Sequence, residues 1–143
     1  STDTEIDLSY FNHPVKSLHL VSGNTTAGND WDSEFTFDKT SLYINGVPLF
    51  EDTSNVYHHT VVPEMHCTDL PDDILEDLPT FSWPFCLTMS KMQPTGTLNF
   101  SRIDNAKLTL TNPSGGNSLH RVYAVNYNIL RVKNGMAGVA FGN

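Results

Sequence analysis

Apolar side chains recur at every second position along most of this chain, and Pro, Gly and Asn interrupt them at short intervals. Residues 106–111 illustrate the pattern, because Leu108 and Leu110 alternate with Lys107 and Thr109. Successive side chains of a β-strand point to opposite faces, so this alternation predicts half-buried strands. Six to eight such strands without a long helical pattern predict an all-β fold, either a sandwich or a barrel.

Turn residues divide the strands. Asn45-Gly46 and Asn134-Gly135 each predict a tight hairpin, because both central residues of a type I′ turn need positive φ. The first turn interrupts a strand pattern over residues 39–50, and the second precedes a short strand over 136–141. A further strand is expected over residues 15–22.

An aromatic-rich strand is expected over residues 81–89, where Phe81, Trp83, Phe85, Leu87 and Met89 share one face. Pro84 cannot donate a backbone hydrogen bond, so this strand should lie at a sheet edge or carry a bulge. The acidic stretch around residues 71–78 is the one place where a short helix is expected, because acids in a first turn suit the helix dipole.

The longest strand candidate spans residues 119–133, and its two faces differ. The face with Tyr123, Val125, Tyr127 and Ile129 is expected in the core. The opposite face is too apolar at its ends for solvent, so it is a candidate inter-domain or inter-subunit surface. Its members are Val122, Ala124, Asn126, Asn128, Leu130 and Val132, and the small Gly138 and Ala140 of the last strand would let a neighbour approach closely.

Length and charge restrict the function. The 143 residues suit a single domain over 1–143. A formal charge of −8 disfavours nucleic-acid binding, which depends mainly on Lys and Arg. No apolar run approaches the length of a membrane span, so direct membrane insertion is not expected.

Catalytic and metal sites are weakly supported. His58, His59, His66 and Cys67 are the candidate metal ligands, but adjacent histidines on a strand would point to opposite sides, and paired zinc motifs are missing. No G-x-S-x-G elbow occurs. We therefore expect no catalytic residue, no metal and no cofactor. Asn24 begins an N-x-[ST] sequon and is a possible glycan acceptor.

A thirteen-residue block over 93–105, Gln-Pro-Thr-Gly-Thr-Leu-Asn-Phe-Ser-Arg-Ile-Asp-Asn, and the stretch 122–143 carry a family resemblance. Together with residues 12–16 they resemble the C-terminal part of the major capsid protein of large icosahedral nucleocytoplasmic DNA viruses, the iridovirus, phycodnavirus and mimivirus group. The motif residues expected to have structural roles are Gln93, Pro94, Gly96, Asn99, Ser101, Arg102, Asp104 and Asn105.

The resemblance implies an eight-stranded jelly-roll sandwich that is the second of two in a longer polypeptide. Its implied partners are the N-terminal jelly roll, two further copies in a homotrimer, neighbouring capsomers and minor capsid proteins. The implied role is structural: trimeric pseudo-hexagonal capsomers tile the icosahedral shell of a virion that is assembled in the host cytoplasm.

Two other functions remain open from the residues alone. A carbohydrate-binding jelly-roll module would need exposed aromatic rings, whereas Trp83 alternates in phase with Phe81 and Phe85 and is expected in the core. A metal-dependent β-sandwich enzyme would need the histidines to converge on an ion.

Overall fold

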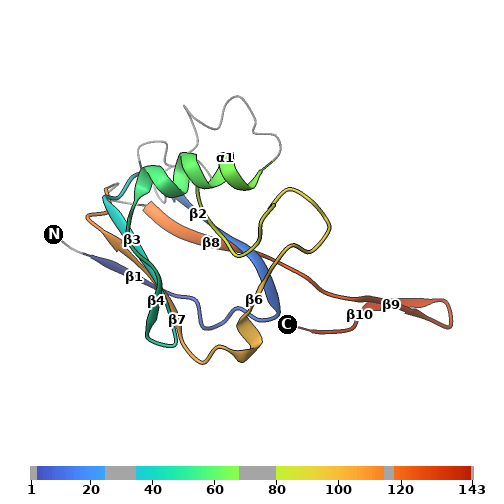
Figure 1. Ribbon diagram of the computed structural model, residues 1–143. Coiled ribbons are helices and arrows are strands. Elements are labelled where there is room, and N and C mark those ends of the chain that lie inside the picture. The colour runs from blue at the N-terminus through green and yellow to red at the C-terminus, as the bar shows by residue number, and fades with distance from the viewer. Residues whose placement is uncertain (1–2, 25–34, 68–79, 115–117, 143) are drawn as a thin grey trace.

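Two four-stranded antiparallel sheets form a sandwich in the computed structural model, which describes residues 3–24, 35–67, 80–114 and 118–142 (Figure 1). The first sheet has the order β1 (Thr4–Asp7), β7 (Ala106–Thr111), β3 (Lys39–Ile44) and β4 (Val47–Ser54). The second sheet centres on β2 (Pro14–Asn24), which pairs with β5 (Phe81–Pro84), β6 (Leu98–Asn99) and β8 (Ser118–Asn126).

A third unit, the hairpin of β9 (Leu130–Lys133) and β10 (Met136–Val139), forms a two-stranded sheet of its own. Figure 1 shows this hairpin projecting away from the sandwich. Among the described residues, the eight strands of the sandwich and the all-β architecture therefore agree with the predicted jelly-roll class, and the hairpin is added to it.

The core lies between the two sheets and draws on both. Leu18 and Leu20 of β2 meet Leu108 and Leu110 of β7, and none of the four exposes any surface. Aromatic rings fill the rest, with Phe37 and Phe81 at 4.5 Å between ring centroids. The remaining buried members of the cluster are Leu8, Val15, Phe35, Leu42, Trp83, Phe100 and Ala106.

Several strand predictions are confirmed. The strands predicted over 15–22 and 106–111 appear as β2 and β7. Asn45 and Gly46 have φ of 49° and 79°, and Asn134 and Gly135 have 52° and 75°, as the two predicted turns require. β5 lies at an edge of its sheet, as Pro84 demands.

The strand predicted over 81–89 is wrong beyond Pro84. β5 ends there, and Leu87 is 73% exposed instead of lying in the core. One more bond follows, from Phe85 N to Lys16 O at 3.0 Å, and the preceding residues of β2, Pro14 and Val15, pair with β6 instead. Apolar and other residues thus continue to alternate in the sequence beyond Pro84, where β5 no longer pairs with β2.

The face prediction for residues 119–133 is also wrong. β8 ends at Asn126, and its register on β2 pairs Val122 with Leu20 and Ala124 with Leu18. Partners across a ladder point to the same face, so Val122 and Ala124 pack against the core. Tyr123 and Val125 point outward and are about half exposed.

A helical segment that the sequence analysis did not predict lies before the acidic stretch. A π-helical turn, η1 (Tyr57–Val61), continues into α1 (Val62–His66). The short helix predicted near 71–78 falls outside the described residues. A 3₁₀ turn, η3 (Phe100–Arg102), follows directly on β6.

Candidate assembly surfaces

The first half of the 93–105 motif supplies a close backbone contact. Gly96 has φ of +143°, and a Cβ built there would lie 2.7 Å from the carbonyl oxygen of Phe85. Only glycine fits both the conformation and the contact. The Thr95 hydroxyl accepts a hydrogen bond from Thr88 N at 3.2 Å, which closes the loop after β5.

The middle of the motif joins the 3₁₀ turn to the start of β2. Asn99 caps η3 by accepting from Ser101 N at 3.1 Å. Ser101 Oγ accepts from His13 N at 2.9 Å, and Phe100 N donates to His13 O at 3.0 Å. His13 has φ of 70°, so these two bonds hold a non-glycine residue in the left-handed region.

The end of the motif holds the first hairpin turn. The side-chain oxygen of Asn45 accepts from the backbone N of both Asp104 and Asn105 at 3.1 Å, and Asn45 N donates to Asn105 O at 2.7 Å. Gln93, Pro94 and Arg102 are exposed. Asn99, Ser101, Asp104 and Asn105 are exposed as well, and the motif thus uses polar groups at the surface for bonds within the sandwich.

The outer face of the second sheet mixes apolar and polar side chains. Tyr123 and Val125 of β8 lie beside His19 and Ser17 of β2 in the ladder. His19 bonds Ser17 Oγ through Nε2 and Ser82 Oγ through Nδ1, each at 2.9 Å, and burial lowers the pKa of His19. The outer face of the first sheet is polar instead, with Lys107 paired to Glu5 at 3.0 Å.

The β9–β10 hairpin has no core of its own. Every residue of its two strands is exposed. The register pairs Leu130 with Val139 and Val132 with Ala137, so these four make one apolar face.

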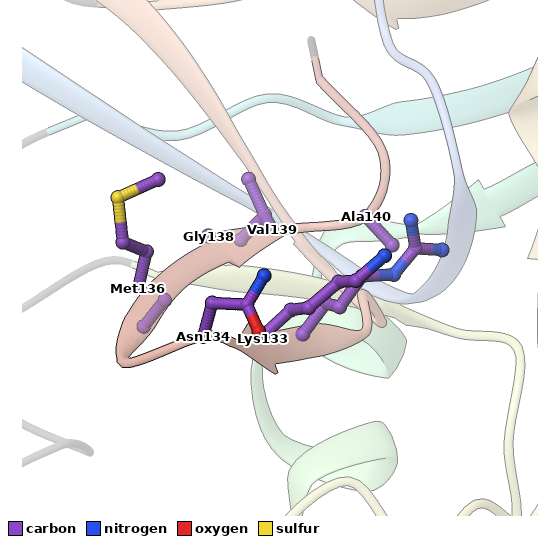
Figure 2. A pocket seen from close by; sticks show the side chains of 8 residues that line it. Lys133, Asn134, Met136, Gly138, Val139 and Ala140 are labelled. Atoms are coloured by element: carbon purple, nitrogen blue, oxygen red, sulfur yellow. The ribbon is translucent and has the colours of Figure 1, made fainter.

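The other face of the hairpin is basic. Arg131 lies opposite Gly138, and Lys133 lies opposite Met136. A shallow hollow follows the hairpin here, and Figure 2 shows the Lys133 side chain lying along it toward Ala140. The hairpin thus has one apolar face and one positively charged face, and both are exposed to solvent.

Hydrogen bonds fix the hairpin at its base. The Asn128 amide donates to Phe141 O at 2.7 Å and accepts from Phe141 N at 3.3 Å, while Ala140 N donates to Ile129 O at 2.7 Å. Tyr127 N donates to Pro14 O at 2.9 Å, which ties this base to β2.

The predicted contact surface is therefore divided. Val122 and Ala124 face the core and are not available to a partner. Asn126 is exposed and weakly bonded to Asn12 O at 3.5 Å, and Asn128 clamps the hairpin. Leu130, Gly138 and Ala140 belong to the hairpin, whose projection from the sandwich the alternating pattern did not reveal.

The histidines near α1 serve the fold. His58 is fully buried, and its ring stacks on that of Trp83 with 4.6 Å between the ring centroids. Its Nδ1 donates a hydrogen bond to Ser82 O at 2.9 Å, and its Nε2 accepts one from Thr53 Oγ1 at 2.6 Å. Burial lowers the pKa of His58 to about 4. His59 and His66 bond the carbonyls of Thr80 and Leu87, each at 3.0 Å.

No group of three potential ligands converges within the described residues. Cys67 and Cys86 are free thiols, and burial raises the pKa of Cys67. Asn24 is the last residue of β2 and pairs with Ser118, but Thr25 and Thr26 fall outside the described residues, so the sequon stays a prediction. The helices in the described parts of the chain are too short to cross a bilayer.

Comparison with known proteins identifies the family. The model for the large eukaryotic DNA virus major capsid protein matches residues 1–138. This chain belongs to that family. A major capsid protein of Pyramimonas orientalis virus is 35% identical across the whole chain, and one of Phaeocystis pouchetii virus is 42% identical over 93% of it. The chain spans 40% and 29% of the length of these two relatives.

Solved structures agree on the fold. The PBCV-1 capsid protein VP54, fitted into a reconstruction of the virophage Sputnik, superposes with a TM-score of 0.79 at 24% identity. The match covers 99% of this chain and 46% of that one. The Faustovirus major capsid protein gives a TM-score of 0.62 at 12% identity, covering 88% of this chain and 32% of that chain. The fold is thus conserved where the sequence is not.

Proposed function

We propose that this chain is the C-terminal jelly roll of a viral major capsid protein and that its role is structural. The observation that carries the proposal is the match of residues 1–138 to the family model. The chain spans less than half of its relatives, so an N-terminal jelly roll in the same polypeptide is part of the proposal. Three copies would form a pseudo-hexagonal capsomer, and capsomers and minor capsid proteins would build a shell assembled in the host cytoplasm.

The distribution of polar groups supports a structural role. The motif residues bond one another and the backbone, and the histidines bond carbonyls or hydroxyls. Apolar side chains are instead exposed on the hairpin and on the outer face of the second sheet. Exposed apolar surface of this kind marks sites of protein–protein contact.

A carbohydrate-binding role gains no support from Trp83, because its ring is fully buried between His58 and the core and cannot stack on a sugar.

The reading frame and its product test the proposal. The frame upstream of Ser1 should encode a second β-sandwich, and the expressed polypeptide should sediment as a trimer with a pseudo-hexagonal outline in electron micrographs. A frame that stops just upstream of Ser1, or a product that stays monomeric at all concentrations, would contradict it.

A further inference from the structure

We propose that the outer edge of β8 is completed by a strand from the stretch of the same polypeptide that lies immediately upstream of Ser1. The inference rests on the proposed capsid function, which places further chain before this domain. It deepens that function by naming the edge and the segment through which the two parts join. Four features of the sandwich carry it: the width of its sheets, the side that is open, the state of the core there, and the path of the chain.

The two sheets of the sandwich differ in width. The first sheet has four strands side by side, in the order β1, β7, β3 and β4. In the second sheet β5 and β6 share one side of β2, since β5 pairs with residues 17–20 of β2 and β6 with residues 14–15. β8 takes the other side of β2 and has no partner beyond it among the described residues. At any level the second sheet is therefore only three strands wide, one fewer than the sheet on which it packs.

The side of the sandwich that carries β8 is the open one. At the opposite side η1 closes the space between the sheets, because His58 accepts a hydrogen bond from Thr53 of β4 and donates one to the Ser82 carbonyl of β5. β4 and β5 are thus the two edges on the closed side. The remaining edges, β1 of the first sheet and β8 of the second, lie on the other side. The second sheet is therefore one strand short next to β8, opposite β1.

The core is less completely closed along β8 than along β2. Leu18 and Leu20 of β2 expose no surface, whereas their register partners on β8, Ala124 and Val122, are only partly buried. On β1, Ile6 packs against the same core and is also only partly buried. A further strand beside β8 would cover these side chains with its own core-facing residues, and burial of apolar surface favours it by about 25 cal/mol per Å².

β8 can accept a regular strand along its length. It pairs with β2 without a register shift between residues 118 and 125, it contains no proline, and none of its described residues has positive φ. Its outward N–H and C=O groups are thus arranged to form a second ladder. β4, the edge on the closed side, differs, because Pro48 has no N–H to donate and Asp52 has φ of 49°.

The path of the chain selects the occupant. β1 begins with Thr4 beside Leu110 at the end of β7, and residues 112–117 carry the chain from there to the start of β8. β1 and β8 therefore start at the same end of the sandwich (Figure 1). A strand antiparallel to β8 would finish at this end, next to Ser118. A link across the ~10 Å between stacked sheets needs roughly three to five residues to reach β1 from there.

Competing arrangements are less favourable. A parallel strand would need a crossover of a dozen or more residues. A strand from a second copy would have to share this end of the sandwich with the chain that leads into β1, and it would lose the entropy of joining two molecules, which a tethered segment does not. We therefore expect the strand within about twenty residues upstream of Ser1, with apolar side chains at every second position beside Val122 and Ala124.

Photo-cross-linking in the full capsid polypeptide tests the proposal. A photoreactive phenylalanine analogue at Tyr123, an exposed position in the middle of β8, should cross-link to the stretch of about twenty residues upstream of Ser1. Mixing isotope-labelled with unlabelled copies shows whether the cross-link lies within one polypeptide. The same analogue at Leu49 on β4 is the matched control, because the two side chains are 49% and 51% exposed, and it should give no cross-link to that stretch.

Hydrogen–deuterium exchange at single-residue resolution gives an independent readout. A strand that pairs on one side protects alternate amides, whereas a strand that pairs on both sides protects consecutive ones. β7 pairs with both β1 and β3 and is the internal reference for the second pattern. Residues 121–125 of β8 should show the same consecutive protection, with each amide exchanging at least about tenfold more slowly than an unprotected one.

Absence of the upstream cross-link from Tyr123 would overturn the proposal. So would a cross-link to another copy, to a different virion protein or to a distant part of the same polypeptide, and so would alternate protection along β8. Trimeric capsomers that give any of these results would refute the added strand while leaving the capsid function intact. A polypeptide that shows the upstream cross-link but stays monomeric would support the strand and count against the proposed capsomer.

Discussion

Trp83 in β5 exposes none of its surface, whereas Leu130 in β9 exposes 70% of its own. Both residues belong to strands in which apolar side chains alternate with others. In the sandwich a second sheet covers the apolar face of each strand, whereas no second sheet within the described residues covers the hairpin. Alternation therefore specifies that a strand has an apolar face, but not that the same chain covers it.

Truncating one leucine in each region gives the sharpest test of this difference. Leu108→Ala should lower the free energy of unfolding by about 2–5 kcal/mol, because it leaves a cavity between two packed sheets. Leu130→Ala should change it by less than about 0.5 kcal/mol, since the side chain is already in water. Urea denaturation followed by tryptophan fluorescence measures both, and similar losses would mean that the hairpin is part of the core.

Acid should weaken the sandwich through His58. Its pKa of about 4 in the folded state lies below the ordinary value of 6.5. Between these two pH values His58 is therefore protonated in the unfolded chain and neutral in the folded chain. The contribution of neutral His58 is thus complete above pH 6.5 and is lost as the pH falls toward 4, on the order of 3 kcal/mol in total. The lowered pKa values of His19 and His120 act in the same direction.

Measuring the unfolding free energy of the parent and of His58→Gln between pH 7 and pH 4 checks this effect. The variant should be less stable at pH 7 but show a shallower decline with acid. An unchanged slope would assign the acid sensitivity to other groups.

Substitutions at two glycines compare the backbone of the sandwich with that of the hairpin. Gly96→Ala should cost about 1–3 kcal/mol, because the new methyl group meets the Phe85 carbonyl and the residue keeps a positive φ. Gly138→Ala on the hairpin should be close to neutral, since nothing lies within 4 Å of the added carbon. Thermal unfolding of both variants measures the difference, and an equal shift in melting temperature would contradict it.

Local signals predicted those parts of the fold that depend on neighbouring residues. The two Asn-Gly turns, the β7 strand and the edge position of β5 follow from turn chemistry, alternation and the missing N–H of Pro84. The face of β8 that points into the core could not be predicted in this way. Both faces are partly apolar, and only the register on Leu18 and Leu20 of β2 decides which one lies inside. The helix around His58 was missed because Val, Tyr and Thr there have no helical periodicity.

The candidate surface was predicted only in part. Leu130, Gly138 and Ala140 are on the hairpin, but no pattern in the sequence indicated that the chain leaves the second sheet after Asn126. The break depends on Tyr127 N bonding Pro14 O and on the Asn128 clamp, which join residues far apart or across a turn. Such contacts are tertiary and carry no local pattern.

The Asn128 clamp also has a mechanical consequence. Because the hairpin is fastened at Asn128 and Phe141 and forms a separate sheet beyond them, a tilt at this pivot disturbs few bonds of the sandwich. Four strand residues extend roughly 14 Å, so a rotation of about 10° carries the tip through roughly 2 Å. In the proposed shell, a lever of this kind would let identical building blocks join at slightly different angles, which a curved container assembled from flat pieces demands.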